Sequence, residues 1–174
     1  MAKKKLPLYE LRINLEEDAI VSAISLVEQP AIEANFLAFN TDFKIEQFSS
    51  DDEKHELLGA AMIPDQRIFR FDKATGEEYE VFFSAETIRQ IAQQYFKMGF
   101  QKSMNLNHSM VPAKSYIFQS YIVDESKGLP APKGVNVPNG SWVIGVKVED
   151  KETWADIKSG KVNGFSIEGT FQFI

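Results

Sequence analysis

The spacing of hydrophobic and polar residues predicts a chain made mostly of short β-strands. Residues 8–14 alternate between apolar and polar side chains, as a strand does when one of its faces is buried. Short runs of this kind, separated by turn residues, recur along the sequence. We predict strands over 8–14, 20–27, 35–39, 43–48, 57–63, 67–71, 79–83, 115–123, 142–148 and 164–173.

Between residues 84 and 99 the period changes to that of a helix. The apolar side chains repeat at the spacing of one helical face, at Ile88, Ile91, Ala92, Tyr95 and Phe96. Ser84 precedes this run as an N-cap, and Gly99 follows its end. A second, shorter helix is expected, with Asp150 as its cap, running through Trp154 and Ile157 and ending before Gly160.

Many strands with two inserted helices, and no regular alternation of strand and helix, favour a β-rich barrel or an α+β domain. A doubly wound parallel sheet is not expected. The length of 174 residues fits one domain with a single core. Residues 124–141, rich in proline and glycine, are expected to form an exposed loop within it.

Composition excludes several classes of function. A net charge of −6 and the lack of a basic stripe argue against a nucleic-acid partner. The absence of cysteine excludes disulfides, thiol catalysis and thiolate metal sites. We expect no metal and no cofactor. No apolar run approaches the roughly 20 residues that span a bilayer, so we expect no membrane association and a cytoplasmic location.

The last predicted strand carries the first candidate for chemistry. In the segment 164–169 (Gly-Phe-Ser-Ile-Glu-Gly), Ser166 and Glu168 share the polar face of the strand. The flanking glycines would let a substrate backbone approach closely. The pattern is not the nucleophile elbow of α/β-hydrolases, in which a helix follows the serine. The simpler interpretation is a half-buried strand that shows a serine on its polar side.

The two histidines, His55 and His108, differ in their surroundings. His55 lies in a charged stretch and is expected to be solvated, whereas His108 follows the segment 104–107 (Met-Asn-Leu-Asn). Imidazole is the usual base for a serine hydroxyl, which makes His108 a candidate general base. A histidine between polar residues is also common in surface loops. A carboxylate pair for glycoside hydrolysis stays open, because acidic residues are numerous and none stands out as a pair.

Four blocks of sequence, in order, resemble the phage prohead (head maturation) serine protease family. They cover residues 58–65, 83–88, 105–108 and 164–169, and the likeness is greatest to the branch found in phages and defective prophages. This family is distantly related to the herpesvirus assemblin proteases. The resemblance implies a closed or nearly closed β-barrel with flanking helices. It further implies a serine endopeptidase with Ser166 as the nucleophile and His108 as the general base.

A fifth block, residues 20–31, resembles a strand that many prohead proteases place after the nucleophile. Here it precedes the histidine, so we infer a circular permutation, which is tolerated when termini lie close together. The acid position of that block falls on Ala23, and alanine cannot orient an imidazole. Either a Ser-His dyad operates or another group orients His108, with Glu168 as one candidate and Glu28 as a weaker one.

The resemblance also implies a biological setting. The expected substrates are the phage major capsid protein and scaffold protein, cleaved inside the procapsid in the host bacterial cytoplasm. A homodimer is expected by analogy with assemblin. We expect residues 1–174 to be one protease domain that lacks the C-terminal scaffold-like segment of family members.

Two rival hypotheses come from other classes of protein. The chain could be a catalytically inactive head or scaffold component. It could instead be a β-barrel binding module in which Ser166 and His108 are unrelated. A working site requires the Ser166 hydroxyl within about 3–4 Å of a His108 nitrogen, and this distance separates the protease from the binding module.

Overall fold

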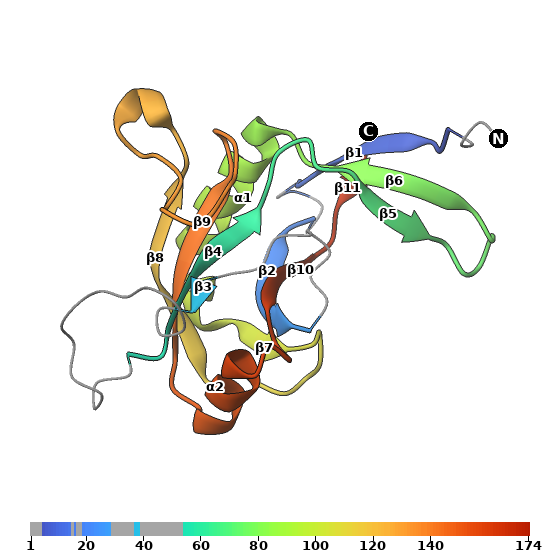
Figure 1. Cartoon of the computed structure of the whole chain (residues 1–174). Coiled ribbons are helices and arrows are strands. Elements are labelled where there is room, and N and C mark those ends of the chain that lie inside the picture. The colour runs from blue at the N-terminus through green and yellow to red at the C-terminus, as the bar shows by residue number, and fades with distance from the viewer. Residues whose placement is uncertain (1–4, 15, 17–18, 29–36, 39–53) are drawn as a thin grey trace.

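The computed structural model describes residues 5–14, 16, 19–28, 37–38 and 54–174. In these ranges the chain forms two α-helices and three β-sheets (Figure 1). The strands are β1 (Leu8–Arg12), β2 (Val21–Val27), β3 (Leu37–Ala38), β4 (Glu56–Met62), β5 (Ile68–Phe71), β6 (Glu78–Phe82), β7 (Met104–Leu106), β8 (Ser115–Ile122), β9 (Trp142–Val148), β10 (Gly164–Gly169) and β11 (Gln172–Phe173). The helices are α1 (Ala85–Lys97) and α2 (Lys151–Lys158).

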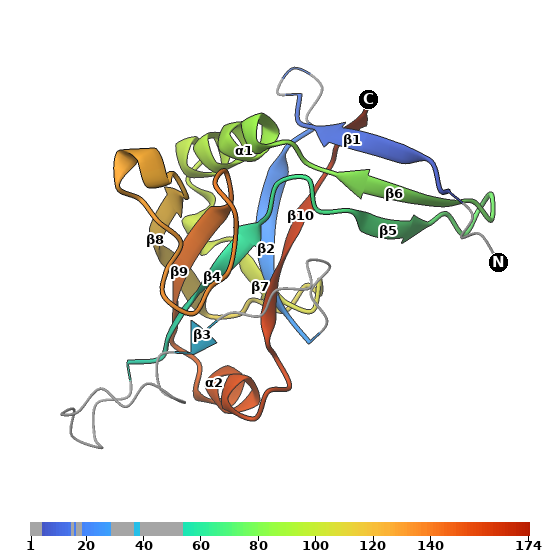
Figure 2. The ribbon, with the colours of Figure 1, turned by 45° about the horizontal axis from the view of Figure 1, so that its top comes forward.

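The three sheets have different roles in the molecule. The first has the order β3-β4-β9-β8 and the second the order β10-β2-β7. The third, β11-β1-β6-β5, forms an arm that projects from the rest of the molecule (Figures 1 and 2). The second sheet and the base of the arm carry the candidate site described below.

The expectation of a closed or nearly closed β-barrel is wrong. Among the described residues the strands form three separate sheets, and none of them closes on itself. One reason lies in the predicted strand 164–173, which is split between two sheets. Its first part, β10, pairs with β2, and a register shift follows at Glu168/Gly169. The chain then crosses to the arm, where β11 pairs with β1.

The predicted helix begins and ends as its sequence indicates. The Ser84 side chain accepts a hydrogen bond from the Thr87 backbone N–H and caps α1. The buried face of α1 includes Tyr95, whose ring meets Trp142 of β9 edge to face at 5.6 Å. Asp150 caps α2 in the same way, through the backbone N–H of Thr153. Both helix predictions are confirmed.

The hydrophobic core contains side chains of α1 and of the first and second sheets. Its largest fully buried side chains are Trp142, Tyr95, Phe165, Ile24, Leu26, Leu57, Ile88, Ile91 and Ile144. The central strands β2 and β9 supply several of them. No described helix has the length and apolar character needed to cross a bilayer.

Most predicted strands agree with the structure to within a few residues at each end. The exceptions are the split last strand and β7 (Met104–Leu106), which the pattern did not predict. The predicted strand 43–48 lies outside the described residues, and of the predicted strand 35–39 only Leu37–Ala38 is described.

Candidate active site

Three polar side chains form a row across the second sheet. Ser166 on β10 is paired with Ser25 on β2, and Ser25 is paired with Asn105 on β7. Residues that are directly opposite on neighbouring strands share one face of a sheet. Glu168, two residues beyond Ser166, lies on the same face. The sheet therefore gathers four hydrogen-bonding side chains on one surface.

A tight turn after β7 presents His108 to this surface. The turn is closed by a hydrogen bond from the Ser109 N–H to the Leu106 carbonyl (2.9 Å). Asn107 and His108 both have left-handed backbones, with φ of 50° and 54°. Residues other than glycine rarely adopt this backbone conformation. Strained residues of this kind are frequent at functional sites.

The strained turn is anchored to the end of β2. The Asn107 N–H donates to the Leu26 carbonyl (2.9 Å), and the Asn107 side-chain oxygen accepts from the Glu28 N–H (3.0 Å). Asparagine tolerates the left-handed conformation better than most residues. The sequence Asn107-His108 therefore suits a turn that holds the imidazole in a fixed place.

His108 lies between Ser166 and Glu168. Its Nε2 is 3.0 Å from the Ser166 Oγ, and its Nδ1 is 3.1 Å from the Glu168 Oε1. Both distances are within hydrogen-bonding range. The arrangement is that of a serine, a base and an orienting acid, with each pair in contact. The rival hypothesis that Ser166 and His108 are unrelated surface residues does not agree with this geometry.

A general-base role for His108 requires one particular tautomer of its neutral imidazole. If Nε2 is to accept the Ser166 proton, the neutral ring carries its own proton on Nδ1. That proton faces the Glu168 Oε1 and also the Ser25 Oγ, which is 3.1 Å from Nδ1. A carboxylate on this side favours the required tautomer and stabilises the ring when it becomes charged.

Ser25 and Asn105 hold Glu168 in position. The Ser25 hydroxyl donates to the Glu168 Oε1, and the Asn105 side-chain amide donates to the same oxygen at 2.5 Å. The Ser25 Oγ also lies 2.7 Å from the Asn105 Oδ1. Ser25 is fully buried, so its hydroxyl is held by these protein partners and not by solvent, whereas the Glu168 side chain is 30% exposed.

The hydrogen bonds keep the Glu168 carboxylate ionised. Desolvation alone raises the pKa of Glu168, but hydrogen bonds from Ser25, Asn105 and His108 act in the opposite direction. Their sum places the pKa of Glu168 below its ordinary value of 4.5. At neutral pH the group is therefore a carboxylate that can face an imidazolium.

The structure distinguishes between the two acids considered from sequence. Glu168 is paired across the sheet with Ala23, the position where the family resemblance places the acid. The carboxylate thus comes from the neighbouring strand, and the alanine leaves room for it. Glu28 instead contacts Asn107, with 3.4 Å between the Asn107 Nδ2 and the Glu28 Oε1.

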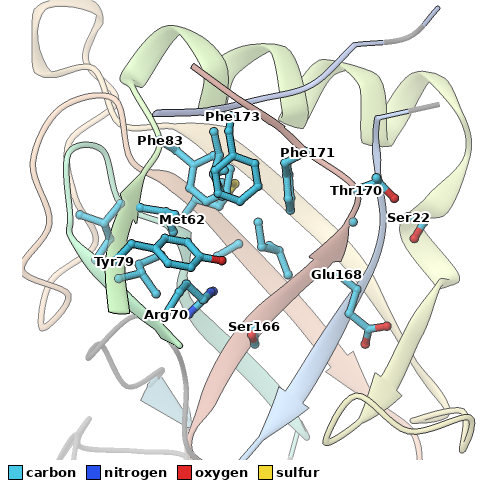
Figure 3. A pocket seen from close by; sticks show the side chains of 17 residues that line it. Ser22, Met62, Arg70, Tyr79, Phe83, Ser166, Glu168, Thr170, Phe171 and Phe173 are labelled. Carbon is cyan, nitrogen blue, oxygen red and sulfur yellow. The ribbon is translucent and has the colours of Figure 1, made fainter. Parts of the chain in front are cut away.

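A cleft of about 710 Å³ adjoins Ser166 (Figure 3). Its walls come from β10 and the segment after it, from the end of β4, and from β5, β6 and β1 of the arm. The lining is mixed: apolar side chains include Met62, Ile68, Phe83, Phe171 and Phe173, and polar ones include Ser22, Arg70, Glu168 and Thr170. This volume is typical of ligand sites in proteins.

Ser166 is the point where the polar network meets the cleft. It lines the cleft although it is only 6% exposed, and its hydroxyl contacts His108. Ser25, the other serine beside His108, is fully buried and does not line the cleft. Of these two, only Ser166 is placed to meet a molecule in the cleft.

Sequence reasoning did not identify Ser25, Asn105 or the cleft. Ser25 and Asn105 lie within the blocks that carry the family resemblance, but nothing in either block shows that they share a sheet face. Their alignment depends on parallel pairing of β2 with β7, a strand that the hydrophobic pattern did not predict. Within the described residues no cluster of three or more histidine, aspartate and glutamate side chains is arranged to hold a metal ion.

Comparisons with known proteins point to phage proteins. The chain is 24% identical over 161 residues to the phage-like element PBSX protein XkdF of Bacillus subtilis (strain 168), covering 88% of this chain and 53% of that protein. It is 23% identical over 160 residues to the uncharacterized protein YqbD of the same strain, covering 90% of this chain and 46% of that one. The chain thus spans about half the length of these relatives. No solved structure matches.

The family comparison covers the part of the chain that holds the proposed nucleophile and base. Residues 44–174 match a family described as "Putative phage serine protease XkdF". This range includes β7, the turn that carries His108, and β10 with Ser166 and Glu168. The chain therefore belongs to this family of phage proteins, as the resemblance of its four sequence blocks indicated.

Proposed function

We propose that the chain is a serine endopeptidase in which Ser166 is the nucleophile, His108 the general base and Glu168 the orienting acid. The observation that carries the proposal is the pair of contacts on the imidazole, 3.0 Å from Nε2 to the Ser166 Oγ and 3.1 Å from Nδ1 to the Glu168 Oε1. Membership of the phage serine protease family supports the same class of reaction.

The reaction follows from this geometry. As the Ser166 Oγ attacks a peptide carbonyl, its proton passes to the His108 Nε2. The Nδ1–H keeps its bond to Glu168, whose negative charge stabilises the imidazolium. The imidazolium then gives the proton to the leaving amine, and an acyl group stays on Ser166. A water molecule, deprotonated by His108, releases it in the second half of the reaction.

We infer that the substrates are proteins of the phage head. The resemblance to prohead proteases supports the major capsid protein and the scaffold protein as candidates, cleaved during procapsid assembly in the host cytoplasm. An open cleft of about 710 Å³ with both polar and apolar lining beside the nucleophile is compatible with a bound polypeptide segment. The alternative of an inactive head component loses its main support, because Glu168 lies opposite Ala23 and contacts His108.

Co-expression with the cognate capsid and scaffold proteins tests the proposal. The wild-type chain should shorten at least one of them, and the Ser166→Ala variant should leave both intact while it remains soluble and folded. Mass spectrometry of the products would give the cleavage sites. Equal trimming by the Ser166→Ala variant, or intact capsid and scaffold proteins beside a folded wild-type chain, would contradict the proposal.

A further inference from the structure

Arg70 projects into the cleft from the arm. In β5 the residues alternate, so that Ile68 and Arg70 line the cleft while Phe69 and Phe71 face away from it, each more than half exposed. Arg70 is paired with Tyr79 of β6, which also lines the cleft. Figure 3 shows both side chains on the wall across from the strand that carries Ser166.

Arg70 differs from nearby arginines in its partners. Arg12 and Arg67, on the outside of the arm, form ion pairs with Glu10 and Glu80 at 2.7 and 3.1 Å. Within the described part of the chain, the contact of the Arg70 guanidinium is a hydrogen bond to the Phe69 carbonyl at 3.0 Å, and no carboxylate pairs with it. Most of its donors are thus left for another group.

Burial makes this positive charge costly. Desolvation lowers the pKa of Arg70, and the neighbouring Tyr79 offsets only part of this effect. A charge taken from water is stabilised when an opposite charge pairs with it. Glu168 lines the same cleft, but its Oε1 already accepts hydrogen bonds from Ser25 and Asn105 and faces His108.

The cleft also contains a cluster of large apolar side chains. Phe83, Phe171 and Phe173 lie together in it, away from Arg70 (Figure 3), and Met62 also lines it. The cleft therefore offers one cationic position and a neighbouring aromatic pocket. A peptide segment with a carboxylate side chain and a large apolar side chain matches both.

We propose that Arg70 is a specificity-determining residue that binds an aspartate or glutamate side chain of the polypeptide substrate, while the adjoining aromatic pocket takes a large apolar side chain. This inference rests on the proposed function and adds the substrate class. The planar guanidinium can bind a carboxylate through two parallel hydrogen bonds, which an amide of the same shape cannot match.

Digestion of a mixed peptide library by the purified chain, with cleavage sites read by mass spectrometry, tests the inference. We expect enrichment of aspartate or glutamate at one fixed position relative to the cleaved bond. For matched peptides, kcat/KM should be at least about tenfold higher with the carboxylate than with its amide. The Arg70→Gln variant should lose this ratio, and the Arg70→Glu variant should prefer lysine at that position.

A control on the same arm separates specificity from structure. The Arg67→Gln variant removes an exposed charge that lies outside the cleft. This variant should therefore show the same preference for acidic over amide peptides as the wild type. If the wild type shows no cleavage that depends on Ser166, the proposed function itself fails. If such cleavage occurs without an acidic preference, or with the same preference in folded Arg70→Gln and Arg70→Glu variants, only the role of Arg70 is overturned.

Discussion

The Ser166→Ala variant is expected to lose peptidase activity by a factor of at least about 10⁴, with its fold unchanged. The hydroxyl is the group that would bond to the substrate carbonyl, and no other described serine both lines the cleft and contacts His108. The His108→Ala variant should lose a similar factor. Since the two residues act as one unit, the double variant should be no slower than either single variant. The cleavage rates of the two single variants and the double variant on one peptide substrate test these expectations.

The Ser25→Ala variant is the matched control for this series. Ser25 also contacts the imidazole, but it acts on Nδ1 and on Glu168 and not on the substrate. Because Asn105 and His108 still hold the carboxylate, we expect its activity to fall by less than about 100-fold. A Ser25→Ala variant as slow as Ser166→Ala, or losses for Ser166 and His108 that multiply in the double variant, would contradict the assigned roles.

The Gly169→Ala variant is expected to have the largest effect among changes outside the polar network. A Cβ at this position would lie 2.5 Å from the Ile20 carbonyl oxygen and 2.9 Å from the Val21 Cα. Both atoms belong to the backbone, so β10 and β2 must separate. We expect a loss of about 1–3 kcal/mol in the free energy of unfolding, and a fall in activity because Glu168 is the preceding residue. Denaturant unfolding and a peptidase assay measure the two effects.

Gly76 provides a control for replacing a glycine. It lies in the β5–β6 turn with a φ of 74°, and a Cβ there would meet no atom within 4 Å. Asparagine tolerates this conformation, so the Gly76→Asn variant should keep stability and activity close to the wild type. Unchanged stability of the Gly169→Ala variant would contradict the requirement for glycine at this close approach of the two backbones.

The local elements could be predicted from sequence because each depends on nearby residues. The period of the apolar residues and the Ser84 cap indicate α1, and alternation with turn residues indicates most strands. The alternation of side chains along the last predicted strand also places Ser166 and Glu168 on one face. How the sheets connect was not predictable, because it depends on the break after Gly169, where the backbone passes too close to Ile20 for any side chain.

The partners of the site depend on contacts between distant parts of the chain. His108 and Ser166 are 58 residues apart, and Ser25 lies 83 residues before His108. The family resemblance suggested the first pair, but it left the acid open because Ala23 occupies the expected position. Only the antiparallel register, which pairs Ala23 with Glu168, shows how a carboxylate reaches the imidazole from the next strand. The circular permutation stays a prediction.

Labelling of the folded chain with a fluorophosphonate tests the central claim most directly, since this reagent bonds to a serine whose hydroxyl is activated by a base. Peptide mapping by mass spectrometry should find one adduct, on Ser166, and the His108→Ala variant should not react. An adduct on Ser25, equal labelling after loss of His108, or no adduct under conditions that label a reference serine hydrolase would contradict the claim that His108 activates Ser166.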